Sequence, residues 1–231
     1  MIDDFGQYNT EGVHEILTMG IPITCAIMPN LDNTNQHMLE AHKAGQQIIV
    51  HLPMEPLEGK RSWLGPGAIT RDLNEKEIKE LCEKDFSTIS YAVGFNNHMG
   101  SAITTNPEIM ERILKIAKEK NFFVLDSKTD SKSLIPQLAS SMGVPWTQRD
   151  VFLDNEKELY YIKEQLNLLS KIASKKGTAV GIGHVGQGGK VTAQAIKEMI
   201  PTMKKQGIEF VYLSEIVLTQ EVIQNKDRNK K

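Results

Sequence analysis

Short apolar runs alternate with helical patterns along almost the whole chain. Within these runs consecutive residues are apolar, as in PITCAIM at 22–28 and QIIVHL at 47–52, instead of every second residue. Runs of this kind are typical of strands buried on both faces, as in a parallel sheet covered by helices. The pattern therefore predicts an α/β fold built from repeating strand–helix units.

The apolar runs give eight strand candidates, which favour a closed or nearly closed barrel. They are Met1–Asp3, Pro22–Met28, Gln47–Leu52, Ser90–Val93, Phe122–Asp126, Val151–Asp154, Thr178–Gly183 and Glu209–Leu213. Helix-start signals lie between them. These signals are Asn74 with Glu77, Asn106 with Pro107, and Asn155 with Glu158.

Composition narrows the class of protein. With 231 residues, 40% of them hydrophobic, and no linker or repeat, the chain is long enough for one domain at 1–218, followed by a charged tail at 219–231. The net charge of -2 gives no basic field to hold nucleic acid. No apolar run is long enough for a transmembrane segment. Two cysteines supply neither a disulfide framework nor a cysteine metal cluster, so any metal must use His, Asp and Glu.

Polar residues gather just after the apolar runs. The carboxyl ends of the strands form the active face of a strand–helix barrel, so we expect these side chains to converge there. Histidine with carboxylate is the ligand set of a zinc-type hydrolytic site. The long connection at 53–70, rich in proline and glycine, is expected at the rim of that site. The residues concerned are Asp3, Asp4, His51, Glu55, His98, Asp126, Asp150, Asp154 and His184.

Other polar residues have simpler interpretations. Asp130, Asp154 and Asn155 are expected to cap helices or close turns. His14, His37 and His42 lie on helical stretches and receive no functional role. Neighbouring carboxylates in a strand point to opposite sides, so Asp3 and Asp4 are expected to divide their tasks between metal and cavity.

Eight motifs, in order, resemble the divergent polysaccharide deacetylase family, a branch of the glycoside hydrolase/deacetylase barrel superfamily. The resemblance implies a distorted (β/α) barrel of seven or eight mostly parallel strands. It also implies a metal-dependent hydrolase that removes N- or O-acetyl groups from a cell-wall or other polysaccharide. The motifs are IDDFG at 2–6, PITCAIMP at 22–29, HLPMEP at 51–56, GPG at 65–67, NNHMGS at 96–101, LDSKT at 125–129, RDVFLDN at 149–155 and GIGH at 181–184.

The resemblance also implies roles for single residues. Asp3 corresponds to the general base, Asp4 to a zinc ligand and His184 to the general acid. The family's better-known members carry two histidine ligands four residues apart, whereas here His51 is followed by Glu55. Either Glu55 is the third ligand or His98 completes the set. We favour Asp4, His51 and His98, with Zn²⁺ as the expected ion, because small and polar residues surround His98.

Further expectations concern the surroundings of the site. Asp126, Arg149 and Asp150 are expected to orient the catalytic groups or bind sugar hydroxyls, and Trp63 and Trp146 to stack on sugars from loops near the rim. The altered histidine motif leaves an alternative, a noncatalytic metal-containing barrel that binds cell-wall glycan or a partner protein. The implied substrate predicts action outside the cytoplasm. The short first strand candidate predicts that residues, including any signal segment, have been removed upstream.

Overall fold

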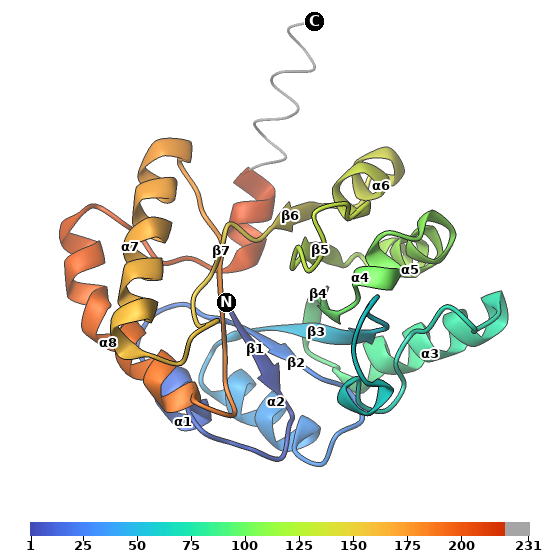
Figure 1. The fold of residues 1–231 in the computed structure, drawn as a ribbon, viewed down its shortest axis with the longest axis horizontal. Helices are drawn as coiled ribbons and strands as arrows, with labels where there is room; N and C mark the ends of the chain where they lie inside the picture. Colours follow the sequence, from blue (N-terminus) through green and yellow to red (C-terminus); the bar gives the residue numbers. More distant parts are fainter. Residues whose placement is uncertain (220–231) are drawn as a thin grey trace, which may run out of the picture.

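A curled sheet of eight parallel strands forms the centre of the molecule, with helices around it (Figure 1). The computed structural model describes residues 1–219; of the predicted tail, all but residue 219 lies outside the described residues. The strand order is β6-β5-β4-β3-β2-β1-β8-β7, so the predicted fold class is confirmed. The strands are β1 Ile2–Phe5, β2 Thr24–Ile27, β3 Gln47–Met54, β4 Ala92–Met99, β5 Phe123–Asp126, β6 Trp146–Gln148, β7 Val151–Phe152 and β8 Gly181–His184.

Eight labelled α-helices and a further helical segment at 213–219 connect and cover these strands within the described residues. In none of them are length and apolar content sufficient for crossing a bilayer. A short 3₁₀ helix, η1 Arg61–Trp63, lies in the long connection after β3. The α-helices are α1 Val13–Leu17, α2 Thr34–Lys43, α3 Glu75–Thr88, α4 Ser101–Thr104, α5 Pro107–Glu119, α6 Ile135–Met142, α7 Leu159–Lys176 and α8 Gly189–Lys205. The residues at 213–219 are also helical.

Two of the three predicted helix starts are confirmed. Asn74 forms a capping box with Glu77, and the side chain of Asn106 caps α5. The third is wrong, because α7 begins only at Leu159. In the segment before α7, Lys157 Nζ donates to Asp154 Oδ2 at 2.8 Å.

Both faces of the strands are apolar, which explains the consecutive apolar runs. Cys25 and Ile27 of β2 pack in the large cluster between the sheet and the surrounding helices, whereas Ala26 packs in a second cluster on the inner face. Ile49 of β3 also belongs to the inner cluster. The helical residues at 213–219 complete this inner layer with Leu213, Ile216 and Val217.

Some strand predictions need correction. Glu209–Leu213 contains no strand, because its buried Leu213 opens a helix whose apolar residues recur three and four positions on. The apolar runs do not predict β6, a three-residue strand with the polar residues Thr147 and Gln148. The predicted strand Val151–Asp154 is shortened to the two residues of β7.

The ring of strands has one open join. Within residues 1–219, β6 pairs with β5 alone and β7 with β8 alone, so no ladder connects β6 to β7. Only Arg149 and Asp150 separate these two strands in the chain. The barrel is distorted at this position and its circle of hydrogen bonds is incomplete.

Candidate functional site

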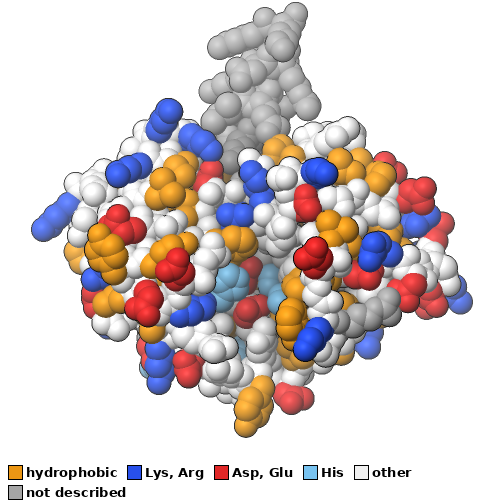
Figure 2. Space-filling view, viewed as in Figure 1, with side chains coloured by type: hydrophobic (Ala, Val, Ile, Leu, Met, Phe, Trp, Pro, Cys, Tyr) orange, Lys and Arg blue, Asp and Glu red, His pale blue; other side chains and the backbone are white. Residues whose placement is uncertain are grey.

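The carboxyl ends of the strands open into a hollow lined by histidine and acidic side chains. Figure 2 shows these side chains gathered near the middle of the face seen in Figure 1. Strand periodicity brings several of them there, because every second side chain of a strand lies on the same face. His51 follows Ile49 and His184 follows Ile182 by two residues, and both isoleucines belong to the inner cluster. The polar site therefore lies directly above the inner apolar layer.

Asp3 and Asp4 face the same imidazole, contrary to the expectation that they point to opposite sides. Asp4 Oδ1 is 3.4 Å and Asp3 Oδ2 is 3.7 Å from His51 Nε2. The cause is local, because Asp4 has φ 68° and the register of β1 against β2 shifts between Ile2 and Phe5. A left-handed residue at an irregularity breaks the alternation of side chains, so both carboxylates reach the site.

The turn after Asp4 is fixed by a buried histidine to which the sequence analysis gave no role. The backbone N–H of Gly6 donates to His37 Nδ1 at 2.8 Å. Gly6 has φ 98°, and a Cβ there would lie 2.8 Å from the carbonyl oxygen of Met28. Gly6 and His37 together stabilise the backbone conformation in which the carboxylates of Asp3 and Asp4 both face the site.

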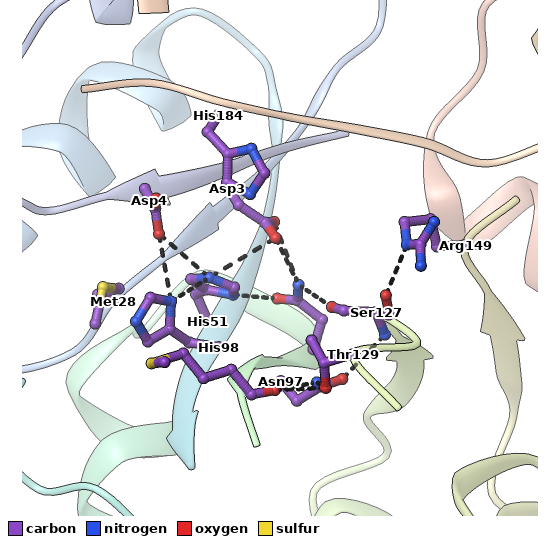
Figure 3. A network of polar contacts seen from close by, with 12 residues as sticks. Asp3, Asp4, Met28, His51, Asn97, His98, Ser127, Thr129, Arg149 and His184 are labelled. Atoms are coloured by element: carbon purple, nitrogen blue, oxygen red, sulfur yellow. Dashed lines mark hydrogen bonds and ion pairs between the residues drawn. The ribbon is translucent and has the colours of Figure 1, made fainter. Parts of the chain in front are cut away.

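Three ligand-type atoms form a small triangle. His51 Nε2 and His98 Nδ1 are 3.1 Å apart, and Asp4 Oδ1 is 3.4 Å from each nitrogen (Figure 3). Donor atoms around a tetrahedral zinc ion lie about 3.4 Å apart, since each is about 2.0–2.2 Å from the metal. The spacing of these three atoms thus fits a metal of this kind.

The charge and hydrogen bonding of Asp4 fit a cation as well. Asp4 Oδ1 is buried and accepts no hydrogen bond of ordinary geometry. Burial alone would raise the pKa of Asp4, but His51 and His98 outweigh it and hold the pKa well below its usual value. A buried carboxylate oxygen without a hydrogen-bond donor, beside two imidazole nitrogens, is a set of ligands that fits a metal ion.

Glu55, the alternative third ligand, is engaged elsewhere. Its carboxylate accepts hydrogen bonds from the backbone N–H of Arg71 at 2.7 Å and from the guanidinium of Arg71 at 3.2 and 3.3 Å. It does not belong to the triangle formed by Asp4, His51 and His98. The structure therefore brings together the set that we favoured and ties Glu55 to the connection after β3.

A second constellation lies at the end of β8. His184 Nδ1 is 2.8 Å from Asp154 Oδ1. Asp154 Oδ2 accepts hydrogen bonds from Lys157, Thr192 and the backbone N–H of His184, at 2.8 to 2.9 Å. Its position in the sequence predicts that Asp154 caps a helix or closes a turn. Instead Asp154 is buried and binds His184, the residue predicted to be the general acid. Nothing in the local sequence distinguishes this role from that of a helix cap.

His184 and Asp154 shift each other's pKa. Burial alone would lower the pKa of His184, but its hydrogen bond to Asp154 and the nearby carboxylates raise the pKa to about 9. Burial alone would raise the pKa of Asp154, but His184 and Lys157 lower it to about 2. At neutral pH the pair is consequently an imidazolium bound to a carboxylate.

The other residues predicted for the site are divided between the hollow at the carboxyl ends of the strands, here called the mouth of the barrel, and other parts of the fold. Asp126 Oδ1 accepts from the N–H of Lys128 in the turn after β5, while its buried Oδ2 has no hydrogen-bond partner. Arg149 donates to the carbonyls of Ser127 and Lys128 at 2.7 and 3.0 Å, and its guanidinium lies 3.6 Å from the ring centroid of Phe152. Both residues therefore shape the mouth beside β5.

Two predicted positions are corrected. Asp150 precedes β7 and accepts from Lys176 and from the N–H of Val180, so it lies at the amino ends of the strands. Trp146 begins β6, packs against the large cluster and donates to Ser140 Oγ at 2.7 Å, so it is not a loop platform. Trp63, by contrast, is exposed in η1, and its carbonyl is 3.4 Å from His98 Nε2.

Comparisons with known proteins place this arrangement in a family. The profile of a family described as divergent polysaccharide deacetylase matches residues 1–217. The uncharacterised protein YibQ of Escherichia coli K12 is 31% identical over 184 residues, which are 80% of this chain and 57% of YibQ. An uncharacterised protein of Haemophilus influenzae is also 31% identical over 184 residues, covering 80% of this chain and 65% of that protein.

These relatives are longer than the chain, which spans about three fifths of their length. Among solved structures, an uncharacterised protein of Agrobacterium tumefaciens has the same fold, with a TM-score of 0.85 and 21% identity. The match covers 93% of this chain and 86% of that one.

Proposed function

The chain belongs to the divergent polysaccharide deacetylase family, and on that premise we propose that it is a zinc-dependent hydrolase of acetylated glycans. It removes N- or O-acetyl groups, and cell-wall glycan of the peptidoglycan type is the substrate class. The observation that carries the proposal is the triangle of Asp4 Oδ1, His51 Nε2 and His98 Nδ1, 3.1 to 3.4 Å apart, with Asp3 beside it.

In this proposal Asp4, His51 and His98 hold the metal. A zinc ion bound by three protein ligands polarises a carbonyl group and lowers the pKa of a water molecule, which favours hydrolysis near neutral pH. The three ligands come from β1, β3 and β4, neighbouring parts of one rigid sheet. The site therefore needs no movement of a loop to bring its ligands together.

Asp3 acts as the general base. Its carboxylate is buried and lies within 3.7 Å of His51 Nε2, so it is close to the place where water attacks. Burial raises the pKa of Asp3, with smaller opposing effects from His51 and His184. A carboxylate with a raised pKa accepts a proton more readily, as general base catalysis requires.

His184 acts as the general acid. Because Asp154 occupies Nδ1, the proton donated to the leaving group comes from Nε2. The side chain of His184 is 28% exposed, whereas that of Asp154 is completely buried. The imidazolium can thus reach substrate while its partner stays away from water. His184 and Asp3 are directly opposite each other in the pairing of β8 with β1, which places acid and base on adjacent strands.

The test is acetate release by purified protein loaded with zinc, using acetylated chitin oligomers and peptidoglycan fragments. We expect release that requires both the metal and Asp3, with Asp3→Asn as the matched control. Protein that binds zinc and these glycans but releases no acetate would support the noncatalytic alternative instead.

The proposal extends to location. Cell-wall glycan lies outside the cytoplasm, so the protein is proposed to act there, as a secreted, periplasmic or wall-associated protein. Fractionation of cells that express the full-length gene tests this. Recovery of the protein only in the cytoplasmic fraction would contradict it.

A further inference from the structure

A buried amide connects the metal triangle to the proposed base. Asn96 of β4 has no exposed surface and lies opposite His51 of β3 in the strand register. Its Oδ1 is 2.9 Å from His51 Nδ1, and its Nδ2 is 3.2 Å from both carboxylate oxygens of Asp3. Nδ2 also donates to Ser127 Oγ at 3.0 Å. Every polar atom of this amide has a partner in the site.

The partners of Asn96 determine which way its amide points. An ionised carboxylate only accepts hydrogen bonds, so the NH₂ group must face Asp3. The carbonyl oxygen Oδ1 then faces His51 and must accept, which requires a hydrogen on His51 Nδ1. In the neutral imidazole the lone pair is consequently at Nε2, the nitrogen that lies in the triangle.

From this geometry we infer that Asn96 is a positioning residue that couples the metal ligand His51 to the base Asp3. One end of the amide fixes the tautomer and ring orientation of His51, and the other holds the carboxylate of Asp3 beside it. The inference rests on the proposed function, since it assumes that His51 binds the metal.

The other histidine of the triangle lacks a comparable partner. His98 Nε2 is 3.4 Å from the carbonyl of Trp63, an exposed residue in a connection, whereas His51 bonds at 2.9 Å to a side chain with no exposed surface. Partners of this kind raise metal affinity about 10- to 100-fold by orienting the ligand. Asn96 is therefore the contact whose loss should affect the site most.

Two substitutions separate the two ends of the amide. Asn96→Leu has similar size but can neither accept from His51 nor donate to Asp3, so zinc affinity should fall about 10- to 100-fold. Asn96→Asp keeps an acceptor for His51 Nδ1 and loses the donor to Asp3. It should bind zinc at least as tightly as the wild type while its acetate release falls. Zinc affinity is measured by competition with a chromophoric chelator.

A spectroscopic signature distinguishes this role from a purely structural one. In the zinc-loaded wild type, the buried Nδ1–H of His51 should give a slowly exchanging downfield imidazole signal in spectra of ¹⁵N-histidine-labelled protein. The signal should persist in Asn96→Asp and disappear in Asn96→Leu. Ser127→Ala is the matched control, because it removes only the third partner of the amide and should leave zinc affinity and the signal unchanged.

The possible outcomes are decisive. Equal zinc affinity in Asn96→Leu and the wild type overturns the inference, as does loss of zinc binding in Asn96→Asp. If Asn96→Leu fails to fold, the Asp variant decides alone. A wild type without stoichiometric zinc overturns the proposed metal site and this inference with it, whereas zinc binding that is insensitive to Asn96 overturns the inference only.

Discussion

Two clusters at the mouth of the barrel use the same residue types in opposite ways. In the triangle of Asp4, His51 and His98, the meeting atoms are a carboxylate oxygen and two ring nitrogens, and the oxygen accepts no hydrogen bond. Around Asp154, each carboxylate oxygen has a partner, and the buried charge is matched by His184 and Lys157. The buried oxygen of the first cluster lacks a hydrogen-bond donor within the protein, whereas both oxygens of the second cluster have donors.

This difference in hydrogen bonding offers a way to distinguish a candidate metal-binding centre from a buried ion pair. Histidine near carboxylate is present in both, so residue type alone does not distinguish them. What distinguishes them is whether the buried acceptors have donors within the protein. The following substitutions test this contrast, from the largest expected effect to the smallest.

Replacing His51 by Ala should abolish stoichiometric zinc binding without unfolding the protein. The substitution removes a metal ligand, so zinc affinity should fall by more than the roughly 10- to 100-fold lost when a residue that only hydrogen-bonds to a ligand is replaced. Metal content by mass spectrometry and the circular dichroism spectrum measure the two parts of this prediction. His14→Ala, an exposed histidine on α1, is the control. Full zinc stoichiometry in the His51 variant would refute the assignment.

Asp3→Asn should reduce acetate release by about 10² or more while zinc remains bound, since general base assistance is typically worth 10² to 10⁴. The amide has the shape of the carboxylate but cannot accept the proton. Initial rates at saturating substrate and zinc content measured on the same sample test this. A rate close to that of the wild type would remove Asp3 from the catalytic role.

Asp154→Asn should change the pH profile more than the metal content. His184 must be protonated to act as an acid, and its pKa of about 9 predicts activity that falls as pH rises through about 9. Without the carboxylate, the fall should move toward pH 6.5, the usual value for histidine. Asp154 itself, with a pKa of about 2, stays ionised across the working range. An alkaline limb unchanged by the substitution would contradict the proposed role of the pair.

Glu55→Gln should have the smallest effect on the metal. Glu55 binds Arg71 and is not part of the triangle, so zinc affinity should equal that of the wild type. The same chelator competition measures it, with His51→Ala as the positive control. A large loss of zinc in Glu55→Gln would restore Glu55 as a ligand and weaken the contrast between the two clusters.

The fold was largely predictable from the sequence, because burial on both faces leaves a strong pattern of consecutive apolar residues. The same pattern misled at Glu209–Leu213, where the apolar positions of a terminal helix resemble a strand. It also failed at β6, since a three-residue strand with two polar residues leaves almost no signal. Length and periodicity thus limit what can be read from local sequence.

The members of the site were easier to predict than their contacts. Residue type and position after a strand identified Asp4, His51 and His98 as candidates. The common orientation of Asp3 and Asp4 was not predictable, because it depends on a left-handed backbone that aspartate adopts only where the surroundings require it. The role of Asp154 depends on a partner 30 residues away.

At the open join between β6 and β7, no hydrogen bonds between these two strands fix the width of the barrel within the described residues. In a closed ring, strands spaced about 4.8 Å apart by hydrogen bonds fix the circumference. Here that closing ladder is absent within the described residues. Arg149, between β6 and β7, instead donates to the carbonyls of Ser127 and Lys128 after β5 and lies against the ring of Phe152 in β7. Side chains can change by substitution far more readily than a strand ladder can. We therefore expect substitutions of Arg149 to change the entrance beside β5, while β1, β3 and β4, which carry Asp4, His51 and His98, keep their pairing.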